Sequence, residues 1–553
     1  MRYSGAEIVV KSLERQGIKI VAGIPGGANL PIYNALYKSS IRHILARHEQ
    51  GAGFIAHGMA RSTGKAAVCL ATSGPGVTNL ITAIADAKLD SVPLIAITGQ
   101  VPRAMIGTDA FQEVDTYGMT LNLTKHSFLV MDPEQLIHII PKAFEIAETG
   151  RPGPVVIDIP KDIQIAEVDV DVWPDRSNDA HTAIDTDRLK EIAHTINTSQ
   201  RPLIYAGGGI IHSGASDVLF ALAKKNSTPV ALTLMGLGAF PHDDALYLGM
   251  LGMHGAQATN YSLYEADVLL AFGARFDDRA IGRAQEFCPY ARIVHIDVDQ
   301  AEINKIKRSA ISLNGDVRYV LEALLPLIEE NRRPEWMSRI REIKSEYPYR
   351  IGQTGEDPLV PINLITQISS IVGPHAIITT DVGQHQMWVA QYYPFMQPRT
   401  LLTSGGLGTM GFGLPAAIGA ALANPEKQVV CISGDGSLQM NIQELATLAE
   451  LNLNIKIVVM NNQHLGLVRQ QQELFFDNNY IASKFTRRLD FAAIAREFGI
   501  RGVNLADTIH PEEMIRRVFE KPGAYIIDVP IHEAENVYPM VPPGAANREM
   551  ITG

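Results

Sequence analysis

The segment Gln428-Val-Val-Cys-Ile-Ser433 runs directly into Gly434-Asp435-Gly436-Ser437. An apolar run that ends in a glycine-rich turn predicts a buried strand followed by the start of a helix. A second apolar run, Ile455 to Met460, ends in Asn461-Asn462, with 24 residues between the second glycine and this pair. Because parallel strands bring their carboxyl ends to one edge of a sheet, we expect the carboxylate and the carboxamide to lie close together.

Asp435 and Asn462 both offer oxygen ligands, which suit Mg²⁺, an ion that commonly completes its shell with phosphate oxygens and water. Gly434 and Gly436 would let the backbone approach a diphosphate, and the helix N-terminus that includes Ser437 adds N–H groups. A Gly-Asp-Gly turn with an N-capping aspartate is the simpler interpretation of the first motif. The asparagine pair at a second strand end favours the metal site.

The alternation of strands and helices occurs three times in the 553 residues, which predicts three doubly wound parallel-sheet α/β domains. We expect these domains at 1–165, 186–330 and 360–530, followed by a C-terminal tail at 531–553. Residues 166–186 are expected to be a linker, and the charged stretch 329–346 a solvated helix and connector. The expected strands are 68–71, 93–98, 155–159, 202–206, 229–233, 268–272, 292–297, 376–380, 428–433, 455–460 and 524–529.

The composition excludes several classes of protein. The net charge is −11 and no basic stretch occurs, which argues against a nucleic-acid binder. The three cysteines are far apart and form no Cys-x-x-Cys pair, so neither a disulfide framework nor a zinc site is expected. No apolar run approaches the roughly 20 residues of a membrane span, and the first residues lack a secretory signal. We expect a soluble, cytoplasmic enzyme.

The spacing of Gly-Asp-Gly and Asn-Asn resembles the signature of the thiamine-diphosphate enzymes. This resemblance implies that Asp435, Asn462 and the backbone carbonyl of His464 hold Mg²⁺ on the diphosphate of thiamine diphosphate. It also implies that Glu49, in Arg47-His48-Glu49, bonds the aminopyrimidine ring, whose imino form then removes the C2 proton of the thiazolium. An isolated glutamate is more often a surface carboxylate, but the apolar surroundings of Glu49 favour the functional interpretation.

Residues 403–415 contain a literal Gly-x-Gly-x-x-Gly from Gly406 to Gly411. A strong preceding strand and a later acidic strand end are both missing, so we reject a dinucleotide fingerprint. The resemblance implies that Met410 supports the bent cofactor, with a core methionine as the alternative. It assigns further cofactor contacts to Gly26, Ser73, Gly74, Asn79, Gln384 and Gly408.

The middle domain resembles the FAD-binding domain of the acetohydroxyacid synthases. The motifs are the glycines 207–209, Met253-His254-Gly255, the stretch from Gly273 to Arg279 with its Phe-Asp-Asp-Arg, and Asp297. A salt-linked turn is the alternative for the Phe-Asp-Asp-Arg segment. The flavin contacts that the resemblance implies are Gly207, Gly208, Met253, His254, Gly255, Gly273, Arg275 and Asp297.

Arg279 is expected to hold the carboxylate of the second keto acid, a task suited to a planar guanidinium. Phe111, Gln112 and Lys161 would line the same cleft from a neighbouring subunit. Gly27 would offer a backbone N–H to the reacting oxygen. Many relatives carry tryptophan at the position of Gln471, so we expect weak discrimination between 2-ketobutyrate and pyruvate.

Over nearly the whole chain the sequence is similar to the acetolactate synthases, especially to large subunits of the bacterial isozyme I type. The resemblance implies that the hydroxyethyl unit of pyruvate is transferred to a second pyruvate or to 2-ketobutyrate, the first common step of branched-chain amino-acid synthesis. It also implies a homodimer or dimer of dimers with active sites at the subunit interface, and a separate small regulatory subunit. The alternatives are pyruvate oxidase, a carboligase, a simple decarboxylase or a non-catalytic flavin- or nucleotide-binding scaffold. Glyoxylate carboligase lacks the activating glutamate that is present here as Glu49.

Overall fold

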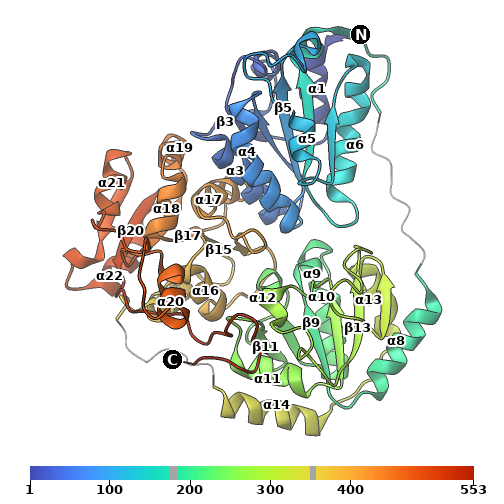
Figure 1. The fold of residues 1–553 in the computed structure, drawn as a ribbon, viewed down its shortest axis with the longest axis vertical. Helices are drawn as coiled ribbons and strands as arrows, with labels where there is room; N and C mark the ends of the chain where they lie inside the picture. Colours follow the sequence, from blue (N-terminus) through green and yellow to red (C-terminus); the bar gives the residue numbers. More distant parts are fainter. Residues whose placement is uncertain (175–183, 349–356, 553) are drawn as a thin grey trace.

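A computed structural model describes residues 1–174, 184–348 and 357–552 (Figure 1). Its main feature is three six-stranded sheets, in each of which every pair of neighbouring strands is parallel. Helices flank each sheet, so the expected α/β class with three parallel-sheet domains is confirmed. All the strands expected from the sequence are present, and their ends move by at most two residues.

The first sheet has the order β3-β2-β4-β5-β7-β6. Its strands are β2 (Ile20–Gly23), β3 (Arg42–Leu45), β4 (Ala67–Ala71), β5 (Leu94–Gln100), β6 (His126–Leu129) and β7 (Val155–Pro160). Its helices are α1 (Gly5–Arg15), α2 (Leu30–Leu36), α3 (Glu49–Thr63), α4 (Pro75–Leu89), α5 (Thr116–Thr120), α6 (Leu136–Glu148) and α7 (Lys161–Ile165).

The middle sheet has the order β11-β10-β9-β12-β13-β14. Its strands are β9 (Pro202–Ala206), β10 (Val230–Leu232), β11 (Tyr247–Met250), β12 (Val268–Phe272), β13 (Arg292–Asp297) and β14 (Ile311–Asn314). Its helices are α8 (Thr186–Thr198), α9 (Gly208–His212), α10 (Ser216–Asn226), α11 (Gln257–Glu265), α12 (Asp278–Ile281), α13 (Val317–Leu324) and α14 (Pro334–Glu346).

The third sheet has the order β16-β15-β17-β18-β20-β19. Its strands are β15 (Ile377–Thr380), β16 (Leu401–Leu402), β17 (Val429–Gly434), β18 (Ile455–Asn461), β19 (Arg501–Asn504) and β20 (Tyr525–Pro530). Its helices are α15 (Pro361–Val372), α16 (Gln384–Tyr392), α17 (Gly413–Ala423), α18 (Asp435–Leu438), α19 (Glu444–Leu451), α20 (Gly466–Phe475), α21 (Phe491–Glu497) and α22 (Pro511–Glu520).

Each sheet has one central reversal of its strand order, and in the first and third sheets the last two strands are also exchanged. The chain leaves β2, β9 and β15 toward one side of the sheet and returns on the other, so the reversals lie at β2/β4, β9/β12 and β15/β17. In open α/β sheets, ligands bind beyond the carboxyl ends of the strands at such a reversal. The sequence motifs that follow these strands therefore lie where this fold binds its ligands.

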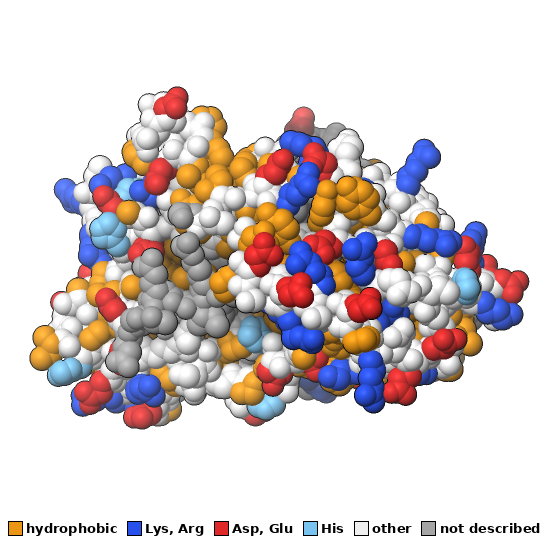
Figure 2. Space-filling view, turned by 90° about the horizontal axis from the view of Figure 1, so that it is seen from below, with side chains coloured by type: hydrophobic (Ala, Val, Ile, Leu, Met, Phe, Trp, Pro, Cys, Tyr) orange, Lys and Arg blue, Asp and Glu red, His pale blue; other side chains and the backbone are white. Residues whose placement is uncertain are grey.

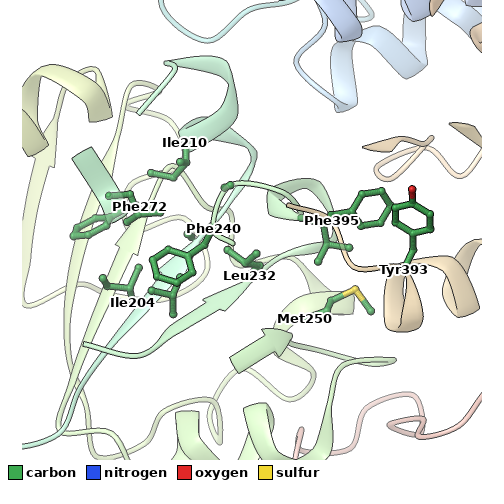
Figure 3. Packing of buried hydrophobic residues seen from close by; sticks show 14 of the residues in the cluster. Ile204, Ile210, Leu232, Phe240, Met250, Phe272, Tyr393 and Phe395 are labelled. Atoms are coloured by element: carbon green, nitrogen blue, oxygen red, sulfur yellow. The ribbon is translucent and has the colours of Figure 1, made fainter. Parts of the chain in front are cut away.

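The apolar cores are continuous between domains. One cluster joins the middle sheet to the third domain, from Phe240 and Phe272 to Tyr393 and Phe395 at the end of α16 (Figure 3). A second cluster joins α3 of the first domain to α17 of the third. This shared burial stabilises one arrangement of the three domains.

Two expected connectors belong to domains. Residues 167–169, expected to be linker, form strand β8 (Glu167–Asp169), which pairs antiparallel with β1 (Arg2–Ser4); residues 175–183 of this stretch lie outside the described ranges. Helix α14, expected to be solvated, buries Trp336, Ile340 and Ile343. The prediction of a fully solvated helix was wrong, because three apolar residues spaced for one helix face lie among its charges.

The C-terminal tail crosses from the third domain to the middle one. The amide of Val541 donates to the carbonyl of Met253, at 2.8 Å, and Asn547 Nδ2 donates to the carbonyl of Ala280, at 2.8 Å. The tail therefore covers the segment that carries Met253 and His254.

In the described ranges, no helix is long and apolar enough to cross a membrane. Basic and acidic side chains are interspersed on the face shown in Figure 2. That face therefore presents no extended basic surface of the kind that binds a phosphate backbone.

Candidate functional site

The glutamate of the first domain begins helix α3. Its side chain is buried, with 8% of the residue exposed, and Asn79 Nδ2 of α4 donates to its carboxylate at 3.0 Å. Gly76 lies beside it, since a Cβ there would be 3.6 Å from Glu49 Oε1. The predicted pair of Glu49 and Asn79 is thus brought together, and Glu49 is not the surface carboxylate that an isolated glutamate would be.

The turns after β2 and β4 lie next to each other. A Cβ on Gly26 would be within 2.7 Å of the Thr72 hydroxyl, so a side chain there would clash with the turn before Ser73. Gly27 is open, with no atom within 4 Å of the position of a Cβ. The residue is also exposed.

The loop before α5 brings Gln112 against Gly74. Gly74 has φ +61°, and a Cβ on it would lie 2.9 Å from Gln112 Cα. Phe111, the residue before Gln112, is 88% exposed. Lys161 is half-buried at the start of α7.

The predicted metal ligands meet at the ends of β17 and β18. Asp435 is buried, and the backbone amide of Gln463 hydrogen-bonds its carboxylate. Asn462 Oδ1 accepts from the amide of His464 at 3.0 Å. The turn after β18 therefore contacts the carboxylate through the Gln463 amide, so the predicted ligands Asp435, Asn462 and His464 lie on adjoining turns at one edge of the sheet.

Burial raises the pKa of Asp435 to about 7. A divalent cation beside the carboxylate would reverse this shift, because it stabilises the charged form. Within the described ranges, no three His, Cys, Asp or Glu side chains gather as a metal site. That finding agrees with a set of one carboxylate, one carboxamide and one carbonyl, completed by a diphosphate.

A histidine that the sequence interpretation missed adjoins this group. His385 is in the first turn of α16, and a Cβ on Gly434 would lie 2.9 Å from its Nδ1. Burial lowers its pKa to about 3, so the ring is neutral. Among the described residues no partner reaches its Nε2. The strand end and glycine before it, at the same sheet edge as Asp435, were the signal that could have found it.

Gln384 links the turn after β18 to helix α20. Its Oε1 accepts from Asn462 Nδ2 at 3.2 Å, and its Nε2 donates to Gln470 Oε1 at 3.1 Å. A buried nitrogen that lacks a partner among the described residues and the N-terminus of α18 suit an anionic group. The residues present therefore fit a diphosphate with a bound Mg²⁺.

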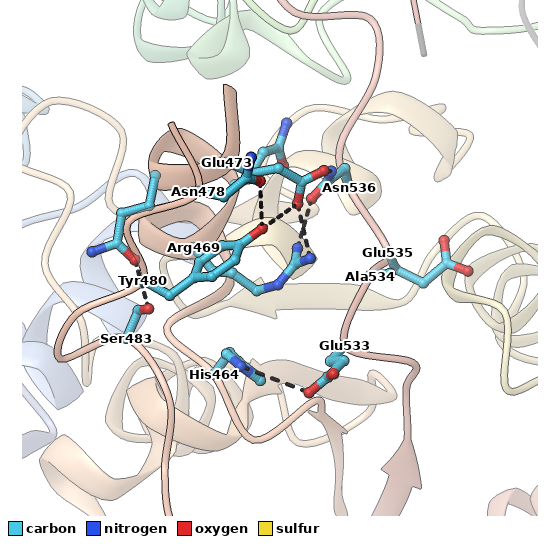
Figure 4. Close-up of polar contacts among 12 residues, drawn as sticks. His464, Arg469, Glu473, Asn478, Tyr480, Ser483, Glu533, Ala534, Glu535 and Asn536 are labelled. Atoms are coloured by element: carbon cyan, nitrogen blue, oxygen red, sulfur yellow. Dashed lines mark hydrogen bonds and ion pairs between the residues drawn. The ribbon is translucent and has the colours of Figure 1, made fainter. Parts of the chain in front are cut away.

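Helix α20 carries Gln471 and is fixed on both sides (Figure 4). Arg469 pairs with Glu473 at 2.8 Å and donates to Asn536 at 3.2 Å. His464 faces Glu533 at 3.8 Å. These contacts join α20 and the turn after β18 to the start of the tail, so the predicted metal and substrate residues share one rigid support.

A cavity of about 1320 Å³ opens at the strand reversal of the middle domain. A Cβ on Gly207 would lie 2.6 Å from Ala274 Cα, so two backbone turns meet at its floor. Burial raises the pKa of Asp297 to about 6 and lowers that of His254 to about 4. The predicted residues that line it are Gly207, Gly208, Met253, His254, Gly273, Arg275, Arg279, Asp297, Gly408 and Gln471.

The cavity has the size and chemistry of a dinucleotide site. Backbone turns rich in glycine suit phosphates, a carboxylate at a strand end suits a ribose hydroxyl, and His254 Nδ1 is buried without a partner among the described residues. These residues fit FAD. The wall also includes Gly209, which belongs to the predicted glycine motif, and Met235 and Asn314, which the sequence interpretation did not name. Asn314 is the last residue of β14, so its place at a strand end was the signal that could have found it.

Many of the predicted residues lie outside the cavity wall, among them Gly255, Glu49, Asp435 and Met410. Gly255 is not in its wall, and packs against the backbone of Leu251. Glu49 and Asp435 do not line it either. Met410 is half-buried in the loop that joins β16 to α17, whose other residues, from Ser404 to Gly408, do line the cavity.

Three family models match the chain in order. Residues 3–119 match the N-terminal thiamine pyrophosphate binding domain of thiamine pyrophosphate enzymes, residues 189–324 the central domain, and residues 381–529 the C-terminal thiamine pyrophosphate binding domain.

Full-length relatives agree with these models. The chain is 54% identical to the acetolactate synthase isozyme 1 large subunit of Escherichia coli, over 100% of this chain and 98% of the relative. It is 46% identical to the isozyme 2 large subunit of the same organism, over 99% of each chain. It is also 46% identical to the chloroplastic acetolactate synthase of Arabidopsis thaliana, over 99% of this chain and 84% of the relative. The chain therefore belongs to the acetolactate synthase large subunits of the thiamine pyrophosphate enzyme family.

Proposed function

We propose that this protein is an acetolactate synthase that decarboxylates pyruvate and transfers the two-carbon unit to a second pyruvate or to 2-ketobutyrate. The products are 2-acetolactate and 2-aceto-2-hydroxybutyrate, the first common intermediates of branched-chain amino-acid synthesis. The observation that carries the proposal is 54% identity to a named acetolactate synthase subunit over the full chain. In this proposal Glu49 transfers the proton and Asp435 and Asn462 hold the metal, and the burial of Glu49 and Asp435 supports these roles.

The proposed cofactors are thiamine diphosphate, Mg²⁺ and FAD. Asp435, Asn462 and the carbonyl of His464 would hold the metal, and Gln384, Gly434, Gly436 and Ser437 would contact the diphosphate. FAD would occupy the middle-domain cavity. Thiamine diphosphate, when bound, supplies the carbanion that adds to the keto carbon and the electron sink for loss of carbon dioxide.

Groups of the chain itself would transfer the proton and bind the charged parts of the substrates. Glu49, buried beside Asn79, would hold and transfer a proton at the aminopyrimidine ring. Arg279, whose side chain is 65% exposed at the cavity mouth, would bind the carboxylate of the acceptor keto acid. The amide of Gly27 would donate to the reacting oxygen, and Phe111, Gln112 and Lys161 would close the cleft around the acceptor.

The proposed assembly is a homodimer or a dimer of dimers with active sites between subunits, joined by a small regulatory subunit, in the cytoplasm. Two features support a partner chain at the site. Phe111 presents its ring to solvent in a single chain. The cavity that holds Arg279 and Gln471 is not lined by Glu49, Phe111 or Gln112, so a second chain would have to supply them.

The test is to give the purified protein thiamine diphosphate, Mg²⁺, FAD and pyruvate, and to measure acetolactate as acetoin after acid treatment. We expect acetolactate from the wild type and a loss of about 10²-fold or more in Glu49→Gln, since general acid–base groups contribute that much. Asn363→Asp, on the exposed side of α15, serves as a control. Acetate, acetaldehyde or no product from the wild type would replace the proposal with another thiamine-dependent reaction, such as that of pyruvate oxidase or another carboligase.

A further inference from the structure

A buried group of charges joins the first domain to the loop that carries Gly408 and Met410. Arg61 of α3 contacts Asp86 of α4 at 3.3 Å and Asp90, the residue that caps α4, at 2.6 Å. Both carboxylates have 0% side-chain exposure and Arg61 has 7%. One cation and two carboxylates are thus buried together, which is costly unless every oxygen is bonded.

The remaining bonds come from the third domain. The amides of Gly405 and Gly406 donate to Asp90 at 2.9 and 2.7 Å. The hydroxyls of Ser404 and Thr409 donate to Asp86, the second at 2.9 Å. Four donors from six consecutive positions of one loop therefore converge on two aspartates of another domain.

The fit around the loop is close. A Cβ on Gly406 would lie 2.8 Å from Asp90 Oδ1, and the turn is closed by the amide of Thr409, which donates to Ser404 Oγ at 2.8 Å. On its far side, the amide of Gly411 donates to Asp381 at 2.7 Å. The loop is thus held from both sides by carboxylates, although it has no helix or strand of its own from 403 to 412.

We propose that Asp86 and Asp90 are positioning residues, which hold this loop from the first domain of the same chain so that it forms a wall of the flavin cavity and presents Met410. Residues 404–408 line the cavity together with Leu89, Asp90 and Ser91. A shift of the loop would therefore alter the flavin site and the Met410 contact at the same time. The inference rests on the proposed function for the identity of the two cofactors.

The matched control is Asp267, at the opposite end of the middle sheet. Its carboxylate accepts the amides of Gln200 and Arg201 at 2.8 and 3.0 Å, as Asp90 accepts two successive glycine amides. Asp267 is absent from the cavity wall. Asp267→Asn therefore removes a carboxylate that accepts two backbone amides, as Asp90→Asn does. It leaves the contacts of the 404–409 loop unchanged.

The experiment titrates FAD into each apoprotein by quenching of flavin fluorescence, and measures the thiamine diphosphate concentration needed for half-activation. We expect Asp90→Asn to weaken FAD binding about tenfold and to raise the half-activation concentration, because charge-assisted bonds to the loop are lost. Asp267→Asn should keep both values while losing stability. Equal effects of the two variants, or unchanged binding in Asp90→Asn, would overturn the proposal.

A second pair keeps the test decisive if Asp90→Asn does not fold. Thr409→Val removes one hydroxyl donor to Asp86 and leaves the charges in place, whereas Thr409→Ser keeps the donor. Weaker FAD binding in Thr409→Val with recovery in Thr409→Ser supports the positioning role, and equal binding in both contradicts it. If the wild type binds FAD but yields no acetolactate, the proposed reaction is contradicted. The comparison of FAD binding among the variants still tests whether Asp86 and Asp90 position the loop.

Discussion

Gln471 occupies the position at which the family resemblance leads us to expect a tryptophan. It lies on α20, exposed, in the wall of the same cavity as Arg279. A carboxamide there offers little apolar surface to the extra methyl group of 2-ketobutyrate, so the two acceptors should be used with similar efficiency.

Replacement of Gln471 by tryptophan should favour 2-ketobutyrate. An indole that packs on one methyl group contributes about 1 to 3 kcal/mol, so we expect roughly a tenfold gain in the ratio of the two products. Competition between pyruvate and 2-ketobutyrate in one reaction measures this ratio directly. Gln471→Asn, which adds no apolar surface, should keep the wild-type ratio, and an unchanged ratio in Gln471→Trp would contradict the expectation.

Asp158, at the end of β7, carries a pH-dependent part of the stability. Burial raises its pKa to about 7, although Thr98 and Gln100 donate to it at 2.6 and 3.0 Å. The unfolded side chain titrates near 3.9. Between these values the folded state holds a proton that the unfolded state has released, so the free energy of unfolding falls as the pH rises through this window.

We expect the stability of the wild type relative to Asp158→Asn to fall by up to about 1.4 kcal/mol per pH unit between pH 5 and 7. Urea unfolding at pH 5, 6 and 7.5 would measure it. Asp187→Asn is the control, because the side chain of Asp187 is 93% exposed. Parallel stability curves for wild type and Asp158→Asn would show that the carboxyl is ionised throughout the window.

At the scale of elements, Arg333 hydrogen-bonds the ends of two helices of the middle domain. It lies just before α14 with φ +44°, and its guanidinium donates to the carbonyls of Ile196, Ser199 and Asn226. These carbonyls belong to the C-terminal ends of α8 and α10, where a cation is favoured. The charged segment at 329–346 is thus part of the packing of the domain.

Arg333→Met should lower the free energy of unfolding by about 3 kcal/mol, because several buried carbonyls lose a charged donor together. Arg332→Met, at the exposed neighbouring position, should change it by less than about 0.5 kcal/mol. Denaturant unfolding of both variants makes the comparison. If both variants lost a similar amount of unfolding free energy, the loss would come from replacing an arginine in this segment and not from the hydrogen bonds to the helix ends.

The elements that the sequence could predict are those with local signals. Runs such as 268–272 and 292–297 appear as strands β12 and β13 with the same bounds, because a central parallel strand is buried on both faces and rich in β-branched and other apolar residues. The three-residue β8 has no such run, and its pairing with β1 depends on a partner more than 160 residues away. His385 follows a strand end and a glycine, but its contact with Gly434 depends on the pairing of β15 with β17, about 50 residues further along the chain.

At the scale of the whole molecule, the domains are joined by polar contacts as well as by shared cores. Arg399 donates to the carbonyl of Arg61 in the first domain at 3.2 Å and to that of Ile211 in the middle domain at 3.0 Å. The tail adds the bond from Val541 to Met253. These contacts join the three domains of one chain, and the proposed active site would combine Glu49 of one chain with Asp435 of a second copy.

This arrangement predicts complementation between two inactive variants, Glu49→Gln and Asp435→Ala. If Glu49 acts at the metal site of a partner chain, a mixed dimer contains one site with both changes and one site with neither. Co-expression with two different tags, followed by tandem purification of mixed dimers, should yield about half of the wild-type activity per dimer, and random mixing about a quarter. Each variant alone should be inactive. A site built within one chain would carry one change in every copy, so a mixed dimer without activity would contradict the shared arrangement.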